Sequence, residues 1–268
     1  MDRAPLNFAF SSCPNDTFAF HALVHGLVSG PRVVPHLDDV EALNARAERG
    51  EAEVTKISIA AYPRIRDRYA LLRAGGAAGF GVGPIVVARS AGSVGGRVAI
   101  PGERTTAALL LRLLGRFQTV PMRFDQIESA ILRRGVDCGV LIHEGRFTYQ
   151  AKGLVLLEDL GALWEARMKC PLSLAAIAIR RDLVSAHGAK IDRALRKSVE
   201  YAIKHPEASR TYVSEHAQEM DAAVAAKHIE LYVNEYTLAL DEHAVHALLD
   251  FAQQQDPTAP PSKAPIFI

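Results

Sequence analysis

GGAAGFGVGPIVVA, residues Gly75–Ala88, combines five glycines with the apolar run Ile85–Ala88 that follows them directly. Glycine adopts backbone angles that other residues avoid, so the first part of this stretch predicts unusual backbone freedom. The apolar run predicts a short buried strand. A longer apolar run, Ser173–Ile179, also predicts a strand. We interpret the two runs as paired crossings, at which the chain leaves one lobe and later returns to it.

The residues before this stretch alternate between strand and helix patterns. Glu41 lies three residues after Asp38, a spacing typical of the beginning of a helix. The predicted elements are a strand at Leu6–Phe10, a helix at Asn15–Leu27, a strand at Arg32–Leu37, a helix from Asp38 to Gly50, and a strand at Val54–Ile59. This alternation predicts a largely parallel sheet covered by helices.

A second series of strands and helices follows the glycine-rich stretch. It consists of strands at Val98–Ile100, Pro121–Phe124, Cys138–Ile142 and Leu154–Leu157, with helices at Thr106–Leu114 and Gln126–Arg134. The chain is then helical from Ala189 to Gln253. We therefore predict a two-lobed α/β fold with a ligand cleft between the lobes. Lobe one takes residues 1–90 and 180–268, lobe two takes residues 91–179, and the paired crossings form a hinge.

Composition narrows the class of protein. The 268 residues are 49% hydrophobic and carry a formal net charge of +1, which provides no broad basic face for nucleic acid. No run of about 18 apolar residues predicts a membrane span. Residues Met1–Phe10 do not form a secretory signal pattern, and the three cysteines have no paired spacing. These features predict a cytoplasmic protein without disulfides. They do not indicate an oligomeric state.

Neither a nucleotide nor a metal site is predicted. The glycines of Gly79–Gly83 have the wrong spacing for a dinucleotide fingerprint, and a strand follows them where that motif needs a helix. His21 and His25 lie four residues apart on one predicted helix, but no carboxylate supports them as metal ligands. His243 and His246 are no stronger candidates. We expect a small anionic substrate and no cofactor.

The first candidate site is Ser11–Thr17, between the first strand and the first helix. Ligands of open α/β sheets lie at the carboxyl ends of strands, where helix N-termini favour anions. Ser11, Asn15 and Asp16 are therefore candidate substrate contacts, although Asn15 or Asp16 could equally be a simple helix cap. Cys13 is a weaker candidate for a nucleophile, because no activating residue lies beside it in the sequence.

The second candidate site is the strand Val54–Ile59. Alternation along a strand places Lys56 and Ser58 on one face and Ile57 on the other. A lysine in a covered strand needs a partner, because burial of an unpaired charge is unfavourable. Lys56 therefore either lines a cleft and binds an anion, or belongs to an edge strand.

The third candidate site lies in lobe two. Thr105 and Thr106 begin a helix directly after a strand and offer hydroxyl groups there, although capping alone explains one of them. His143 ends the run Cys138–Ile142 and is followed by Glu144. A histidine at this sheet edge is suited to be a general base, although it could also be a surface residue. A nearby Lys56 would lower the pKa of His143 and keep it neutral.

These sites together resemble a known enzyme family. The segments Ser11–Phe18, Lys56–Ser58, Gly81–Pro84, Thr105–Thr106 and Ile142–Glu144 are similar, in order and spacing, to those of the 1,4-dihydroxy-6-naphthoate synthases. These enzymes act on the futalosine route to menaquinone. The resemblance runs from the first strand to the final helices and includes Arg146–Tyr149 and Asp159–Gly161.

The resemblance implies a type 2 periplasmic-binding-protein-like fold and a lyase activity. The substrate would be cyclic dehypoxanthinyl futalosine, from which a sugar-derived fragment is released without metal or redox cofactor. The family's catalytic histidine corresponds to His143, and its substrate-contacting segments correspond to Lys56-Ile57-Ser58 and Thr105-Thr106. Ser12 departs from the family pattern, which has proline there.

Three other functions remain open from the sequence. Chorismate dehydratase, another enzyme of the same pathway, has a similar two-lobed shape, but the Ser11–Thr17 and Ile142–Glu144 segments favour the naphthoate synthase. A non-catalytic solute-binding protein shares the fold class. A ligand-sensing domain of a regulator is less favoured, because no DNA-binding helix-turn-helix is attached.

Overall fold

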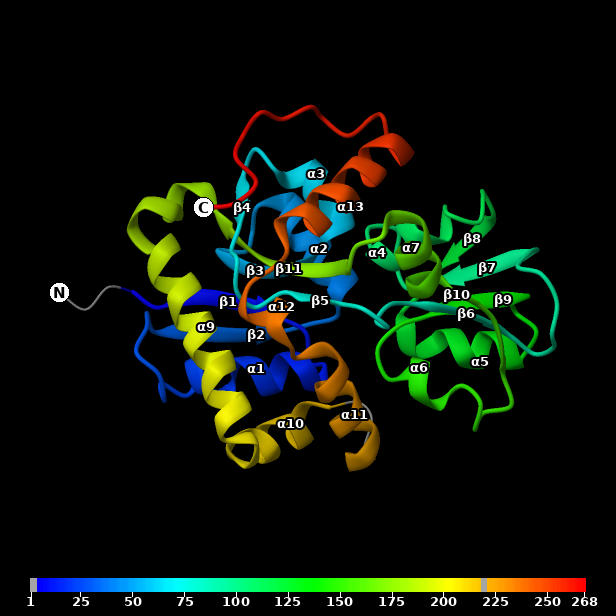
Figure 1. The fold of residues 1–268 in the computed structure, drawn as a ribbon, viewed down its shortest axis with the longest axis horizontal. Coiled ribbons are helices and arrows are strands. Elements are labelled where there is room, and N and C mark those ends of the chain that lie inside the picture. The colour runs from blue at the N-terminus through cyan, green and yellow to red at the C-terminus, as the bar shows by residue number, and fades with distance from the viewer. Residues whose placement is uncertain (1–3, 218–220) are drawn as a thin grey trace.

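The computed structural model describes residues 4–217 and 221–268, and it contains two β-sheets that lie side by side (Figure 1). The first sheet has six strands in the order β2-β1-β3-β11-β4, with β5 also paired to β11. Its strands are β1 (Leu6–Phe10), β2 (Val33–Leu37), β3 (Val54–Ser58), β4 (Tyr69–Leu71), β5 (Ala77–Gly79) and β11 (Leu172–Arg180). The predicted α/β class is confirmed.

The second sheet is built from one continuous part of the chain. Its five strands have the order β10-β6-β9-β7-β8. They are β6 (Ile85–Ala88), β7 (Arg97–Ile100), β8 (Gln118–Pro121), β9 (Cys138–Leu141) and β10 (Val155–Asp159).

The sheet predicted to be largely parallel contains one reversed strand, β11, and the second sheet contains one reversed strand, β6. In the first sheet β1 is parallel to β2 and β3, but β11 runs antiparallel to β3, β4 and β5. In the second sheet β7 is parallel to β8 and β9, whereas β6 is antiparallel to β9 and β10. Parallel neighbours need a crossover connection. The strands β6 and β11 instead enter their sheets from the other half of the molecule, and they are antiparallel to their neighbours.

Helices cover both sheets and pack together at the C-terminal end (Figure 1). Helix α1 lies against α9, α10 and α11. The helices are α1 (Pro14–Val24), α2 (Val40–Arg49), α3 (Tyr62–Ile65), α4 (Thr106–Leu111), α5 (Ile127–Leu132), α6 (Gly145–Thr148), α7 (Leu160–Met168), α8 (Arg181–Leu183), α9 (Ala189–Lys204), α10 (Arg210–His216), α11 (Ala222–Tyr232), α12 (Glu235–Leu238) and α13 (Glu242–Gln255).

Several predicted boundaries are wrong by a few residues. Helix α2 is capped by Asp39 rather than Asp38, because the Asp39 carboxylate accepts hydrogen bonds from the N–H groups of Glu41 and Ala42. The strand expected at Pro121–Phe124 ends at Pro121, where the chain turns into a short 3₁₀ helix. The strands β4 and β5 and the helix α7 were not predicted. Strand β5 lies inside the glycine-rich stretch and has almost no side chains to reveal it.

The glycine-rich stretch has the backbone freedom that its composition predicts. Gly81 and Gly83 have φ angles of 70° and 123°, which disfavour residues with a side chain. A Cβ atom on Gly83 would lie 2.8 Å from Leu172 Cδ2 and 3.0 Å from the Cα atom of Gly161. Glycine is therefore required where the chain passes closely beside the start of β11 and enters β6.

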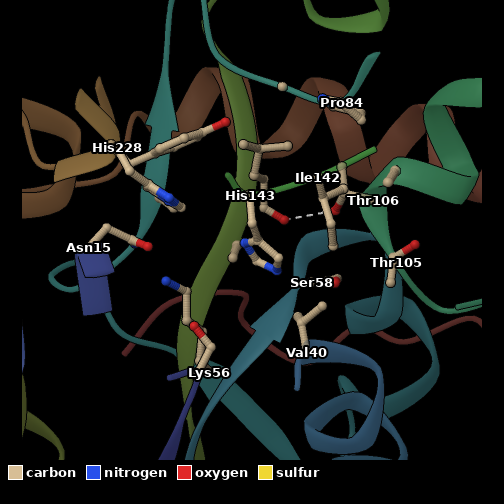
Figure 2. A pocket seen from close by; sticks show the side chains of 17 residues that line it. Asn15, Val40, Lys56, Ser58, Pro84, Thr105, Thr106, Ile142, His143 and His228 are labelled. Atoms are coloured by element: carbon tan, nitrogen blue, oxygen red, sulfur yellow. Dashed lines mark hydrogen bonds between the residues drawn. The ribbon is translucent and has the colours of Figure 1, made fainter. Parts of the chain in front are cut away.

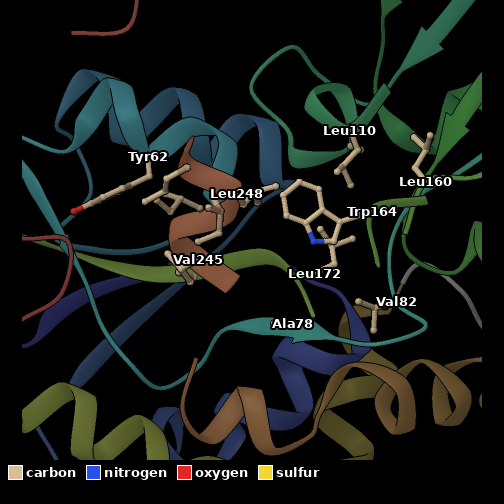
Figure 3. Close-up of a cluster of buried hydrophobic side chains, with 14 of the residues drawn as sticks. Tyr62, Ala78, Val82, Leu110, Leu160, Trp164, Leu172, Val245 and Leu248 are labelled. Atoms are coloured by element: carbon tan, nitrogen blue, oxygen red, sulfur yellow. The ribbon is translucent and has the colours of Figure 1, made fainter. Parts of the chain in front are cut away.

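One hydrophobic core joins the two halves. It includes Ile57 and Tyr62 from the first sheet and its connections, and Val98 and Leu110 from the second. Figure 3 shows Trp164 between Leu110 and the Leu248 side chain of α13. Such continuous packing resists wide separation of the two sheets, since opening would expose apolar surface to water.

A polar link also joins the two halves. Arg104, in the loop before α4, donates hydrogen bonds to Glu41 Oε1 at 2.9 Å and to Glu48 Oε2 at 2.8 Å, both on α2. Its guanidinium therefore connects the second sheet to the first beside the site described below. No helix in the described parts of the chain is long and apolar enough to cross a membrane.

Candidate active site

A cavity lies between the two sheets, lined by residues from β3, α4, α11 and the end of β9 (Figure 2). Its volume is about 90 Å³. Seven of the nine predicted site residues line this cavity, namely Ser11, Asn15, Lys56, Ser58, Thr105, Thr106 and His143. The structure thus brings together residues of all three candidate sites, although Ser11 and His143 lie 132 residues apart in the sequence.

The other two predicted residues lie behind the cavity wall. Ile57 is fully buried in the core that joins the two halves. Asp16 is 1% exposed, and its carboxylate accepts hydrogen bonds from Ser11 Oγ at 2.6 Å, Asn15 Nδ2 at 2.9 Å and Lys56 Nζ. Protein donors therefore surround Asp16, and it acts on Lys56 rather than on a ligand.

Lys56 is a buried cation in the interior of the first sheet. Its strand β3 pairs with β1 on one side and with β11 on the other, so the edge-strand interpretation of Lys56 is wrong. The side chain forms an ion pair with Asp16 and also lines the cavity. Burial of a charge is unfavourable unless it is paired, and Asp16 provides that pairing. Lys56 can still direct ammonium hydrogens toward a ligand.

Ser58 is held by a residue that the sequence analysis missed. Asn44, fully buried on α2, donates from Nδ2 to Ser58 Oγ at 3.0 Å and accepts from the Ser58 N–H group at 2.8 Å. Because the Ser58 oxygen accepts from Asn44, its own hydroxyl hydrogen remains available to a ligand in the cavity. An asparagine in the middle of a helix was the available signal, since this residue type is uncommon there.

The hydroxyl groups of the two threonines are already engaged. Thr105 is the N-cap of α4, and its Oγ1 accepts from the Ala108 N–H group at 3.1 Å and donates to the Gly102 carbonyl at 2.9 Å. Thr106 Oγ1 donates to the Leu174 carbonyl at 2.7 Å, which connects α4 to β11. Both residues line the cavity, but their hydroxyl groups form hydrogen bonds within the protein and hold the cavity wall in place.

His143 follows β9 in a strained backbone conformation. Its φ angle is 55°, which is uncommon for a residue other than glycine and typical of functional sites. Its ring makes an edge contact with Phe124, with 4.9 Å between centroids. Burial, and then the positive charge of Lys56, lower the pKa of His143 to about 3. The predicted effect of Lys56 is confirmed, although burial is the larger cause.

Cys13 lies beside this histidine, which the sequence could not show across 130 residues. Its Sγ atom is 3.2 Å from His143 Nδ1. Burial, and then the negative charges of Glu144 and Asp16, raise the pKa of the Cys13 thiol well above its usual value. Both members of the pair are therefore neutral at pH 7. This arrangement is the reverse of an activated thiolate–imidazolium pair, and it does not favour Cys13 as a nucleophile.

A second histidine, His228 on α11, also lines the cavity and was not predicted. It is 1% exposed, and its ring stacks over that of His143 with centroids 6.2 Å apart and planes 22° apart. Burial, and then the neighbouring His143 and Lys56, lower the pKa of His228 well below its usual value. One histidine in a long helical region gives no sequence signal, because most such residues lie at the surface.

Metal-ligand clusters were also considered. Within residues 4–217 and 221–268, no group of three histidine, cysteine or acidic side chains is placed to hold a metal ion. His21 and His25 share one face of α1, as predicted, with ring centroids 4.4 Å apart. The Nδ1 atom of His25 lies 2.9 Å from the His21 carbonyl oxygen, and none of the described residues supplies a third metal ligand to the pair.

Comparison with known proteins identifies the family. A family profile described as menaquinone biosynthesis matches residues 6–256. The chain belongs to this menaquinone-biosynthesis family. A family member from Thermus thermophilus, named 1,4-dihydroxy-6-naphtoate synthase, is 46% identical over 98% of this chain and 99% of its own length. A relative of the same name from Streptomyces coelicolor is 46% identical over 92% of both chains. The resemblance inferred from the sequence motifs is confirmed.

Solved structures support the same fold. A crystal structure of an Archaeoglobus fulgidus protein is 38% identical, with a TM-score of 0.89 over 94% of this chain and 97% of that one. The periplasmic aliphatic sulphonate-binding protein of Escherichia coli has a TM-score of 0.71 at 11% identity, covering 98% and 91% of the two chains. The second likeness concerns the fold alone, and it confirms the periplasmic-binding-protein-like class for this family member.

Proposed function

We propose that this protein is a 1,4-dihydroxy-6-naphthoate synthase that cleaves cyclic dehypoxanthinyl futalosine and releases a sugar-derived fragment. The observation that carries the proposal is the neutral His143 imidazole, which faces Lys56 and Ser58 across a cavity between the two sheets. The names of two relatives at 46% identity support the dihydroxynaphthoate product. We also propose that the two lobes, residues 1–90 with 180–268 and residues 91–179, close around it.

His143 is proposed to be the general base. A base must be unprotonated before it can accept a proton from the substrate, and the lowered pKa of His143 ensures this at neutral pH. If that proton comes from a hydroxyl group of the fragment, its oxygen forms a carbonyl as the carbon–carbon bond breaks, and the electrons of that bond complete the aromatic naphthoate ring. His143 then returns the proton to the naphthoate product. Formation of the aromatic product provides driving force, so this step needs no cofactor.

For Nε2 of His143 to be the accepting atom, the ring proton must reside on Nδ1. Cys13 Sγ lies 3.2 Å from Nδ1 and 3.6 Å from Nε2, so the sulfur packs against the imidazole between the two nitrogens rather than along one N–H bond. Cys13 would therefore hold the ring in place by packing, without selecting one tautomer. The Ser58 hydroxyl and the Lys56 ammonium would stabilise negative charge that develops on a substrate oxygen.

Lys56 is also the proposed contact for the aryl carboxylate. Its charge is shared with Asp16, so the cavity wall carries an ion pair with no net charge rather than an isolated cation. A substrate carboxylate would add a second anionic partner to one ammonium group. Such a contact favours a singly charged organic anion over a doubly charged one, because the available positive charge is limited.

A second candidate is non-catalytic binding of a small organic anion. The fold shared with the sulphonate-binding protein favours it, since that protein is by name a binding protein for an aliphatic sulphonate. Chorismate dehydratase remains the alternative enzyme. The two alternatives differ from the main proposal in their substrates or products, so incubation with cyclic dehypoxanthinyl futalosine and a separate incubation with chorismate together distinguish all three.

The deciding experiment is incubation of the purified protein with cyclic dehypoxanthinyl futalosine, followed by mass spectrometry. We expect the naphthoate and the released fragment in equal amounts. His143→Asn should keep substrate binding and lower kcat roughly 10²–10⁴-fold, the range for loss of a positioned acid–base group. His246→Asn, an exposed change on α13, is the matched control. Binding without products would support the anion-binding alternative, and turnover of chorismate would support the dehydratase.

A further inference from the structure

His228 is a buried polar side chain, and one of its nitrogens has no hydrogen-bond partner among the residues that the structure describes. Its Nδ1 atom is shielded from solvent and makes no hydrogen bond within the described residues. Buried polar groups in folded proteins nearly always have a partner, so an exception calls for an explanation. His228 also lines the cavity proposed to hold the substrate, which suggests that the explanation is functional.

The surroundings of His228 orient its ring. The Glu144 Oε1 atom lies 3.8 Å from His228 Nδ1, slightly beyond hydrogen-bond distance. The Tyr232 ring, one turn further along α11, packs against the same imidazole with 4.7 Å between centroids. The two nitrogens of an imidazole point in different directions. When Nδ1 faces Glu144, Nε2 therefore points away from Glu144. Figure 2 shows that the His228 ring points into the space it shares with His143 and Lys56.

We propose that His228 contacts the substrate directly and accepts, through Nε2, a hydrogen bond from a hydroxyl group of the sugar-derived fragment. This inference rests on the proposed function. A carboxylate opposite Nδ1 stabilises the tautomer with its proton on Nδ1, which leaves the Nε2 lone pair facing the cavity. A shift of less than 1 Å on substrate binding would bring Nδ1 and Glu144 into hydrogen-bond contact.

The charges around His228 keep it an acceptor. Lys56 on β3 and His143 after β9 both disfavour a second proton on the ring, and burial acts in the same direction. Glu144 opposes them from the start of α6, but its effect is to hold the proton on Nδ1. A neutral acceptor attracts hydroxyl groups and repels the lone pairs of a carboxylate. The substrate is thereby oriented with its carboxylate toward Lys56 and its polyol fragment toward His228.

The test compares three variants with the wild-type protein. His228→Leu removes the acceptor, whereas His228→Gln retains a carbonyl oxygen near the position of Nε2. We expect the leucine variant to raise KM for cyclic dehypoxanthinyl futalosine at least 10-fold, and the glutamine variant to recover most of that loss. Binding of the naphthoate product, measured by calorimetry, should change less than about twofold, because the product lacks the fragment. His246→Leu on α13 is the exposed control.

The outcomes distinguish this inference from the proposed function. If the wild-type protein produces no naphthoate, the proposed function fails, whatever the variants show. If wild type turns over and His228→Leu has an unchanged KM, or if glutamine is no better than leucine, the inference is overturned. Equal loss of substrate and product binding would also overturn it, since that result indicates a structural role. Should the leucine variant not fold, His228→Asn takes its place, because its shorter amide does not reach the Nε2 position.

Discussion

The buried neutral state of His143 makes the stability of the fold depend on pH in a calculable way. In the folded protein the pKa of His143 is about 3, whereas in the unfolded chain it returns to about 6.5. As pH falls below 6.5 the unfolded chain binds a proton that the folded protein does not. The contribution of neutral His143 to the free energy of unfolding is therefore fully present above pH 6.5, and it is lost progressively as the pH falls toward 3.

The size of this effect follows from the two pKa values. About pH 5 is roughly 1.5 units below the pKa of His143 in the unfolded chain. Protonation of the unfolded chain at this residue therefore lowers the free energy of unfolding by about 2 kcal/mol. This figure is an upper value, because water on the cavity side of the partly exposed ring screens the added charge. His228 contributes in the same direction, so only a single-residue variant isolates the share of His143.

The assay is urea unfolding followed by circular dichroism at about pH 7.5 and about pH 5, at constant ionic strength. Wild type should lose up to about 2 kcal/mol more than His143→Asn between the two conditions. His246→Asn, exposed on α13, should behave as wild type does. An equal pH dependence in wild type and His143→Asn would refute the reasoning, because it would mean that His143 binds its proton equally well in both states.

Other parts of the site lead to three further predictions. Lys56→Met should destabilise the fold by about 3–5 kcal/mol in thermal or urea unfolding, since it leaves Asp16 buried and unpaired. The double variant Lys56→Met, Asp16→Asn should recover most of that stability without recovering substrate binding; recovery of both would remove Lys56 from the anion site. Arg104→Ala removes the hydrogen bonds to Glu41 and Glu48 that join the two halves. It should therefore raise KM and enlarge the radius of gyration of the ligand-bound protein in small-angle scattering. Unchanged values would show that these hydrogen bonds do not support closure. Activity should survive exhaustive chelation, and a loss restored by one defined metal would contradict this.

The sequence was most informative where chemistry and local pattern coincide. The ends of β1, β3 and β9 carry polar residues at or soon after apolar runs, and this pattern identified Asn15, Ser58 and His143, which line one cavity between the two sheets. The period-two pattern also separated Lys56 from Ile57 correctly, since only Lys56 reaches the cavity. These successes depend on residues close together in the chain.

The missed features depend on contacts between distant residues. Nothing beside Cys13 in the sequence indicates that His143 will lie 3.2 Å from its sulfur. A residue in the first turn of a helix, as Asp16 is, can contact a ligand or cap the helix, and the sequence does not distinguish these roles. Asp16 is the partner of Lys56 because β3 lies beside it in the folded protein. His228 belongs to a helix whose burial results from packing against α1, which no local pattern reports.

The strand order of the first sheet also affects how the protein can fold as it leaves the ribosome. Strand β11 lies between β3 and β4, so β1 to β3 cannot complete their sheet until residues Leu172–Arg180 have emerged. All strands of the second sheet lie within residues 85–159, and they are available earlier. The first sheet, whose strands β1 to β3 are synthesised first, is therefore completed last. Its apolar strands remain exposed to solvent until β11 has been synthesised. A nascent chain arrested before Leu172 should have protease-resistant structure in the second sheet while β1 to β3 remain cleavable.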